Sequence, residues 1–253
     1  MIDPTKRFST RVDNYVKYRP GYPRGIIDLL TSECGLTPTA TVADIGSGTG
    51  ILSELFLQHG NSVYGVEPNQ DMRQAAKRLL KHYPGFKSID GKAEATTLDD
   101  NSVEFITAGQ AFHWFDQEKA REEFIRILKP EGWTALIWNE RRLNSSEFLR
   151  ALEELLVKSG IDYGQVRHEN VYGDFAAFFG ANGFKLSTFD NVQQLDREGL
   201  KGRVFSASYT PEPGHPNFES MLEQLLAIFR THERSGKVTI EYDTRVYYGQ
   251  LRN

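Results

Sequence analysis

Hydrophobic and polar positions alternate along this chain with two periods, one typical of strands and one typical of helices. A β-branched run around Val42 and Ile45 predicts a buried strand, and similar runs cover 62–66, 86–90, 103–108 and 133–138. Apolar residues at helical spacing predict helices over 50–59, 69–82, 117–129 and 146–159. Strands that alternate with helices in this way favour an α/β fold with a mostly parallel sheet.

The second half of the chain is less regular. It predicts a short helix over 174–182, strands over 184–192 and 237–248, and a helix over 217–231. The segment 1–32 has a helical pattern that Pro20 and Pro23 interrupt. We see no internal repeat, so the sequence predicts a single domain over 1–253.

Composition narrows the class of protein. The chain has 253 residues, of which 39% are hydrophobic, and no apolar run approaches the ~20 residues of a membrane span. The first residues, MIDPTKRFST, lack the apolar core of a signal peptide. A single cysteine, Cys34, excludes an internal disulfide and a cysteine-based zinc site, so no metal is expected. We expect a soluble, cytoplasmic protein that is a monomer or homodimer and does not bind membranes.

The net charge of the chain indicates which classes of substrate it could bind. The net charge is −4, and no block of lysine and arginine interrupts the sequence. This disfavours a nucleic-acid substrate, although a local basic patch remains open. A small-molecule substrate is the expectation.

Residues 41–50, TVADIGSGTG, carry the clearest chemical signal. A short strand ends in three glycines, Gly46, Gly48 and Gly50, and a helical pattern follows at once. Glycines permit a tight turn with positive φ and a close approach of a ligand to the backbone. The helix that follows offers unpaired N–H groups at its start. This arrangement predicts a nucleotide-like cofactor at the carboxyl end of a parallel sheet.

Two neighbouring residues favour S-adenosylmethionine (SAM) over a dinucleotide. The dinucleotide fingerprint requires glycine or alanine at position 51, where this chain has Ile51. Asp44, two residues before Gly46, would repel a pyrophosphate but would attract the ammonium of SAM. An NAD(P)-dependent oxidoreductase is therefore the weaker alternative. A non-catalytic SAM-binding protein is a second alternative, although no motif is degraded.

Acidic residues also follow the next two strands. Glu67 lies 17 residues after Gly50, near the spacing expected of a ribose-binding acid. Its other interpretation is a helix-capping acid, because Pro68 and Asn69 open the next helix. After the strand at 86–90, the backbone N–H of Ala93 and the carboxylate of Glu94 are candidates for adenine contacts. Taken alone, Glu94 is typical of a solvated surface acid.

Four motifs resemble those of class I SAM-dependent methyltransferases: VADIGSGTG, VYGVEPN, DGKAEATTLDDNSVEFITAGQAFHWF and LKPEGW. The resemblance covers about residues 40–140. YRPGYP at 18–23 and QAFHWF at 110–115 are similar to the trans-aconitate-methyltransferase-like branch of small-molecule methyltransferases.

This resemblance implies a Rossmann-like, doubly wound sheet of seven strands, mostly parallel with one antiparallel strand. It implies a SAM-binding core over 40–140, and a lid built from an N-terminal arm (1–35) and a helical insertion (195–235). S-adenosylhomocysteine would be the product. The implied cofactor-binding residues are Tyr18, Arg19, Asp44, Gly46, Ser47, Gly48, Thr49, Gly50, Glu67, Pro68, Met72, Ala93, Glu94, Gln110, Ala111 and Phe112.

The arm contains Phe8, Tyr15, Tyr18 and Arg19. Arg19 is a candidate for a bidentate contact with the SAM carboxylate, and the tyrosines are candidates for covering the methyl-donor end. The ordinary alternative is a surface stack of arginine on aromatic rings.

The resemblance places the loop after the fourth strand beside the sulfonium. His113 is therefore a candidate general base for a hydroxyl or amine nucleophile, whereas a carboxylate would need no base. The alternative is a structural histidine, and Trp114 is expected to be a pocket wall. The predicted substrate-binding residues are Tyr15, His113, Trp114, Arg203 and Tyr209.

The substrate itself is harder to predict. Arg141, Arg142 and Arg203 are expected near the pocket mouth, with Ser206 and Ser208 as polar neighbours of Tyr209. An arginine-lined pocket would favour a small carboxylic acid, although each arginine alone is typical of the surface. O- or N-methylation of another small metabolite stays open.

Overall fold

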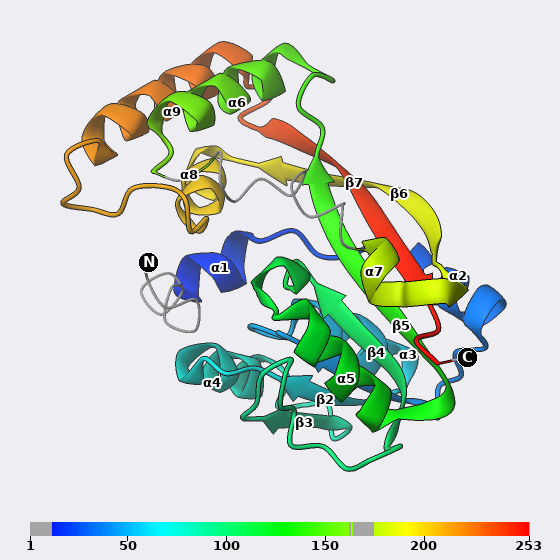
Figure 1. Ribbon diagram of the computed structural model, residues 1–253. Coiled ribbons are helices and arrows are strands. Elements are labelled where there is room, and N and C mark those ends of the chain that lie inside the picture. The colour runs from blue at the N-terminus through cyan, green and yellow to red at the C-terminus, as the bar shows by residue number, and fades with distance from the viewer. Residues whose placement is uncertain (1–11, 162, 164–174, 253) are drawn as a thin grey trace.

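A seven-stranded sheet forms the centre of the computed structural model, which describes residues 12–161, 163 and 175–252 (Figure 1). Its strand order is β3-β2-β1-β4-β5-β7-β6. Only β7 runs antiparallel to its neighbours, β5 and β6, while the other pairs are parallel. The expected doubly wound sheet with one antiparallel strand is therefore confirmed. The strands are β1 (Thr41–Ile45), β2 (Ser62–Val66), β3 (Phe86–Ile89), β4 (Val103–Gly109), β5 (Leu128–Arg141), β6 (Lys185–Leu195) and β7 (Val238–Gly249).

Helices cover both faces of this sheet. On one face, α2 (Gly25–Cys34) and α3 (Ile51–His59) share a hydrophobic core with β1, β4 and β5. On the other face, α5 (Gln117–Ile127) and α7 (Phe175–Phe179) pack in a core rich in phenylalanine. The helix α4 (Gln70–Leu79) contacts β3 and begins at Asn69, whose side chain accepts a hydrogen bond from the Met72 N–H.

A third hydrophobic core lies outside the sheet domain and defines a helical cap. It joins α6 (Glu147–Ser159), α8 (Arg197–Phe205) and α9 (Phe218–His232) to the distal ends of β6 and β7. Figure 1 shows these helices gathered on one side of the sheet, beyond its carboxyl ends. The predicted insertion over 195–235 supplies α8 and α9, whereas the participation of α6 was not expected.

The N-terminal arm divides into two parts with different roles. Ile26, Ile27 and Leu30 of α2 are buried in the sheet core, so α2 is a covering helix and not part of a lid. The helix α1 (Val12–Tyr18) instead packs between α8 and α4, as Figure 1 shows. Among the described residues of the predicted arm, α1 and the loop that follows it are therefore the part that remains outside the sheet core. Phe8 lies outside the described residues.

Most predicted boundaries agree with the structure within three residues. The exception is β5, which was expected over 133–138 and extends over Leu128–Arg141. Val103 pairs with Leu128, and the pairing then shifts to Phe105 opposite Trp133. The turn residues of LKPEGW thus belong to a strand whose pairing is irregular. Hydrophobic periodicity does not predict such an irregularity. In the described part of the chain, no helix has the length and hydrophobicity needed to cross a bilayer.

Candidate functional site

The glycine loop after β1 has the backbone geometry that its sequence predicts. Gly46, Gly48 and Gly50 have φ of 67°, 55° and 87°, in the left-handed region. A Cβ on Gly46 would lie 2.6 Å from the Cβ of Ala111, whereas a Cβ on Gly48 would meet nothing within 4 Å. Gly48 therefore leaves open space beside the loop. A Cβ on Gly50 would meet Leu80 at 2.5 Å, so Gly50 serves packing under the loop.

Asp44 is fully buried beneath this loop. Its carboxylate accepts hydrogen bonds from Ser53 Oγ at 2.6 Å and from Thr107 Oγ1 at 3.3 Å. Burial nevertheless raises the pKa of Asp44 to about 7. A carboxylate held at this cost without a cationic partner among the described residues fits a ligand that brings its own positive charge.

Glu67 follows β2 and is held by backbone donors. Its two carboxylate oxygens accept hydrogen bonds from the N–H groups of Gly48 (2.9 Å) and Asn69 (2.8 Å). Burial raises its pKa, and these hydrogen bonds oppose the shift. Each oxygen retains acceptor capacity. The side chain is thus fixed in place and can still receive two hydroxyl donors, as a ribose would supply.

A cavity of about 230 Å³ opens between the glycine loop, Glu67 and the loop after β4. It contains many of the residues predicted to bind the adenosine part of SAM. Its wall is formed by Tyr15, Gly46, Gly48, Glu67, Pro68, Asn69, Met72, Lys92, Ala93, Glu94, Gly109, Gln110, Ala111, Trp114 and Phe115.

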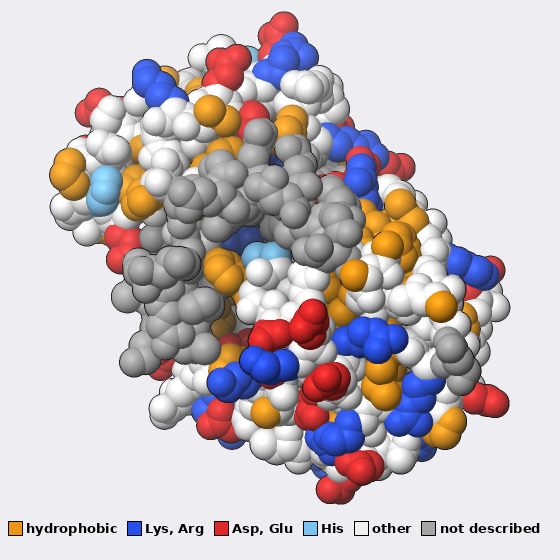
Figure 2. Space-filling model, viewed as in Figure 1, with side chains coloured by type: hydrophobic (Ala, Val, Ile, Leu, Met, Phe, Trp, Pro, Cys, Tyr) orange, Lys and Arg blue, Asp and Glu red, His pale blue; other side chains and the backbone are white. Residues whose placement is uncertain are grey.

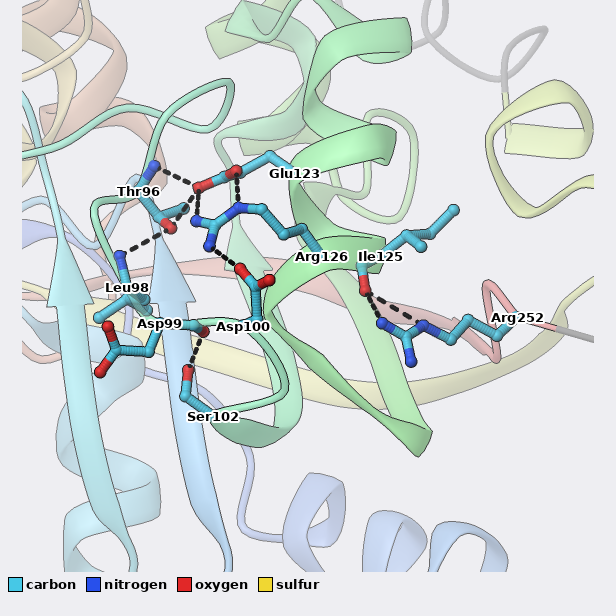
Figure 3. Close-up of polar contacts among 9 residues, drawn as sticks. All are labelled: Thr96, Leu98, Asp99, Asp100, Ser102, Glu123, Ile125, Arg126 and Arg252. Atoms are coloured by element: carbon cyan, nitrogen blue, oxygen red, sulfur yellow. Dashed lines mark hydrogen bonds and ion pairs between the residues drawn. The ribbon is translucent and has the colours of Figure 1, made fainter.

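The segment that carries Ala93 and Glu94 is fastened to α5 (Figure 3). Glu123 of α5 accepts hydrogen bonds from the backbone N–H of Thr96 (2.7 Å) and from its hydroxyl (2.5 Å). Arg126 donates to the same carboxylate and also pairs with Asp100 at 2.6 Å. Glu94 accepts a hydrogen bond from the Asp116 N–H at 2.8 Å. These contacts position the cavity wall, of which Glu94 is itself a part.

Replacing Glu123 by glutamine should lower the free energy of unfolding by about 1 to 2 kcal/mol, because the donors of Thr96 and Arg126 lose a charged acceptor. Arg126 lowers the pKa of Glu123 to about 2, below the ordinary 4.5. A carboxylate with a lowered pKa stabilises the fold above pH 4.5, and this contribution is lost as the pH falls toward 2. Urea unfolding at about pH 7 and about pH 3 measures the difference, which should shrink at the lower pH. Asp100→Asn is the control, since its exposed ion pair should matter by less than about 1 kcal/mol.

A second, narrower cavity adjoins the first, and the two share Tyr15, Gly46, Gly109 and Gln110. Its lining adds Arg19, Pro20, Tyr22, Asp44, Ser47, Thr49, Ile51, Leu52 and Asn139. The two cavities therefore meet at these four residues. Arg19 and Asp44 are both in the second cavity, but no ion pair joins them among the described contacts.

Arg19 is partly buried, and its hydrogen-bonding capacity is only partly satisfied. Its Nη2 donates to the Ser206 carbonyl at 3.0 Å, and its guanidinium lies 4.7 Å from the centre of the Tyr15 ring. Its Nε has no hydrogen-bond partner among the described residues, and neither has the buried Thr49 hydroxyl. Burial, followed by the charge of Arg203, lowers the pKa of Arg19. Unpaired donors at Arg19 and Thr49 fit a carboxylate, and Asp44 fits an ammonium. The amino-acid end of SAM has both groups.

Asn139 connects the arm to the floor of the site. Its Nδ2 donates to the Gly21 carbonyl at 3.2 Å, and its backbone N–H donates to Gln110 Oε1 at 3.2 Å. Its Oδ1 accepts from Thr244 Oγ1 at 2.5 Å. Gln110 itself has a φ of 55°, a strained conformation for a residue with a side chain, at the point where β4 turns into the pocket. The arm is thus anchored beside the cofactor cavity.

Several predicted site residues lie elsewhere. Tyr18 does not line either cavity: its ring packs against Gly202 of α8, where a Cβ would approach it to 2.0 Å. Phe112 is fully buried and packs on Phe178 and Trp138, so its ring belongs to the core. A sequence motif indicates which residues lie near the ligand, but it does not indicate the direction in which each side chain points. Tyr18 and Phe112 were predicted to contact the cofactor for this reason.

Of the predicted substrate residues, Tyr15 and Trp114 line the cavities described above, whereas His113, Arg203 and Tyr209 are not in the lining of either. Trp114 lines the first cavity, and the His113 ring lies 4.6 Å from that of Trp114. Tyr15 lines both cavities. Arg203 is buried in the cap, and the Tyr209 ring lies 4.8 Å from that of Tyr163. In Figure 2 a hollow between cap and sheet exposes a histidine and a cationic side chain at its bottom.

Other functional residues were missed by the sequence analysis. Tyr22 lines the second cavity and lies against Gly109, where a Cβ would be 2.5 Å from its hydroxyl. Burial, and then the charges of Tyr15 and Asp44, raise its pKa well above the ordinary 10. The repeated tyrosine in YRPGYP was the available signal. Asn139 gave none, because a single asparagine at the end of a strand has no distinctive pattern.

Two of the three arginines expected at the pocket mouth have carboxylate partners. Arg141 pairs with Glu153 and donates to the Tyr163 hydroxyl at 2.9 Å. Arg142 pairs with Asp190 and with Asp243. Arg203 donates to the Tyr242 hydroxyl at 3.1 Å and has no carboxylate partner among the described residues.

Comparison with known proteins agrees with this geometry. A profile described as a methyltransferase domain matches residues 43–136, which span β1 to β5. An uncharacterized methyltransferase of Schizosaccharomyces pombe is 30% identical over 234 residues, covering 91% of this chain and 90% of that protein. The chain belongs to the class I SAM-dependent methyltransferases. Its cofactor is SAM, and the cavities described above lie where this family's core motifs meet.

Other similarities are more limited in extent or in identity. An uncharacterized methyltransferase of Mycobacterium tuberculosis is 35% identical over 162 residues, 62% of each chain. A solved structure from Anaeromyxobacter dehalogenans has a TM-score of 0.65 at 19% identity and covers 93% of this chain and 99% of that chain. The YcgJ protein of Bacillus subtilis has a TM-score of 0.55 at 21% identity, covering 91% and 98%. At these identities the two structures support the shared fold.

Proposed function

We propose that this methyltransferase transfers the methyl group of SAM to a small-molecule acceptor that carries a carboxylate, with oxygen as the nucleophile. The observation that carries the proposal is the excess of positive charge beneath the cap. Arg203 is buried, Arg19 and Arg141 are partly buried, and Glu153 is the one carboxylate paired with any of these three guanidinium groups in the described part of the chain.

The amino-acid end of SAM accounts for only part of this excess. Its carboxylate can neutralise Arg19, and its ammonium can neutralise Asp44. Arg141 already has Glu153. Arg203 is then left buried, with a tyrosine hydroxyl as its polar partner. A buried guanidinium without a counter-charge is unfavourable, and an acceptor carboxylate beside it would remove this penalty.

The chain's part in the reaction is chiefly to position groups and exclude water. SAM supplies an activated methyl group on a sulfonium when it is bound. Tyr15 lines both cavities and, with α1, covers them from the side of the cap. Holding the nucleophile at ~3 to 3.5 Å in a dry site provides most of the rate enhancement that such a transfer needs. A carboxylate requires no general base, so His113 would act only to orient it.

The same arrangement argues against a macromolecular acceptor. Arg203 is buried, and the protein carries a net charge of −4. A nucleic acid would need an exposed basic surface to neutralise its phosphates. A small acid that enters the cleft beneath the cap suits the buried cation better.

Assays with methyl-labelled SAM and a matched panel of acceptors test the proposal. The panel should contain mono-, di- and tricarboxylic acids, phenols and amines of similar size. We expect label in the base-labile methyl ester of one or more acids. Label in phenols or amines alone would contradict the assignment to carboxylates. No transfer to any member, despite SAM binding, would favour a non-catalytic SAM-binding protein.

Replacing Arg203 by methionine should raise the KM for the acid acceptor at least about tenfold, because a buried charge-assisted contact is lost. The affinity for SAM should change little. Arg203→Lys should recover part of the loss. Arg142→Met is the matched control, since Arg142 already pairs with Asp190 and Asp243 and should leave the KM unchanged. An unchanged KM in Arg203→Met would place the acceptor elsewhere.

A further inference from the structure

The outer strand of the sheet presents an exposed, partly apolar face. β6 stands at the end of the strand order, and in the described part of the chain no strand pairs with its outer side. Its even-numbered residues from Leu186 to Gln194 are all exposed. Leu186 is 49% exposed and Val192 is 63% exposed. A long, exposed edge strand with apolar side chains is a surface that can pair with another chain.

The other face of β6 is already occupied. Phe189 packs against Gly25, Asn191 donates to the Gly21 carbonyl at 2.9 Å, and Gln193 donates to the Tyr18 carbonyl at 2.8 Å. These contacts hold the arm. Residues that alternate along the strand therefore have separate roles. The odd-numbered residues hold the arm, whereas Leu186 and Val192 lie on the exposed face, where Asp190 pairs with Arg142. Figure 2 shows hydrophobic side chains on the side of the molecule where Figure 1 places β6 and α7.

We infer that β6 is a dimerisation edge that pairs antiparallel with β6 of a second copy of this chain. The inference does not depend on the identity of the methyl acceptor. The dimer would join two seven-stranded sheets into one continuous sheet across a two-fold axis.

The sequence of β6 is complementary to itself in one register. With the two-fold axis at Phe189, Leu186 of each copy lies opposite Val192 of the other, which places apolar side chains in cross-strand pairs. Thr188 then lies opposite Asp190, a neutral donor against a carboxylate. The same strand thus supplies both halves of each pair.

The neighbouring register is less favourable. With the axis at Asp190, that carboxylate would face its own copy, and Leu186 would face Gln194. The apolar pairs are lost in this register, and like charges lie directly opposite each other, a repulsion that the pairing of each Asp190 with Arg142 only partly offsets. The register that matches apolar residues is therefore also the one that avoids charge repulsion. This self-complementarity makes a second copy of this chain the partner that fits β6.

Sedimentation velocity across a concentration series tests the inference. The wild-type protein should show a monomer–dimer equilibrium, and Val192→Lys should raise the dimer dissociation constant at least about tenfold. Val157→Lys is the matched control, because Val157 is 59% exposed on α6 and should leave the equilibrium unchanged. At a concentration low enough for both variants to be monomeric, thermal unfolding should be the same in both, which separates dimer loss from misfolding.

Cross-linking tests the register. In a Cys34→Ser background, the pair Leu186→Cys and Val192→Cys should form a covalent dimer on oxidation, since directly opposed residues approach to disulfide distance. Neither single cysteine should cross-link efficiently, because each then lies opposite a residue without a thiol. A wild-type protein that is monomeric at its highest soluble concentration would overturn the inference. So would a dimer that Val192→Lys leaves intact.

Discussion

Replacing Asp44 by asparagine is expected to weaken SAM binding at least about tenfold, or about 1.4 kcal/mol, because the variant loses the negative charge that faces the SAM ammonium. The wild-type protein should also bind SAM more weakly as the pH falls. The pKa of Asp44 is about 7, so only about one tenth of the protein carries the carboxylate at about pH 6. Calorimetric titration between about pH 5.5 and 7.5 measures both effects, below the range in which the α-amino group loses its proton.

The same substitution should not destabilise the protein without ligand. The folded-state pKa of Asp44 is raised above its ordinary 3.8, so the stability it contributes falls as the pH rises from about 4 to about 7. Above that window, ionised Asp44 costs on the order of 4 kcal/mol of stability. Asp44→Asn should therefore unfold at an equal or higher urea concentration near pH 8. A variant that loses stability and keeps SAM affinity would contradict the assigned role.

Replacing Arg19 by methionine should have an effect of similar size, for the complementary reason. Arg19 has an unpaired Nε in the second cavity, and we assign it to the SAM carboxylate. Truncating one member of a buried, charged pair typically costs 2 to 5 kcal/mol, so SAM affinity should fall by about 30-fold or more. Arg19→Lys should be intermediate, because an ammonium cannot make the bidentate contact.

A ligand without the amino-acid end separates this role from damage to the fold. 5′-Methylthioadenosine carries the adenosine and sulfur of SAM but neither the carboxylate nor the ammonium. Arg19→Met and Asp44→Asn should leave its affinity within about threefold, whereas Glu67→Gln should weaken both ligands. Equal losses for SAM and 5′-methylthioadenosine in Arg19→Met would show that Arg19 supports the cavity and does not bind the carboxylate.

The sheet domain was predictable because each of its strand–turn–helix units has a local sequence pattern, although the pairing of the strands joins distant segments. β1, the glycine turn and α3 form one local unit, and the positive φ of Gly46, Gly48 and Gly50 follows from the lack of a Cβ. Asp44 and Glu67 both follow or end strands that pair in parallel, so topology brings them to one edge. The fold predicted from the strand and helix pattern was therefore enough to place Asp44 and Glu67 near the glycine loop.

The cap was less predictable because it depends on contacts between distant segments. α6 joins α8 and α9 through buried leucines and phenylalanines, and its periodicity gave no sign of which surface it would cover. Tyr18 and Arg19 are adjacent in sequence, yet one packs on Gly202 and the other enters the cofactor cavity. Arg142 pairs with Asp243, 101 positions away, a partner that charge patterning cannot reveal.

Calorimetric titration of the wild-type protein with SAM, with NAD as the matched control, tests whether the glycine loop and its neighbouring acids form a SAM site. We expect one SAM site per chain, with affinity that falls below pH 7 and is reduced in Asp44→Asn, and no measurable binding of NAD. Tight binding of NAD in the absence of SAM binding would contradict this expectation.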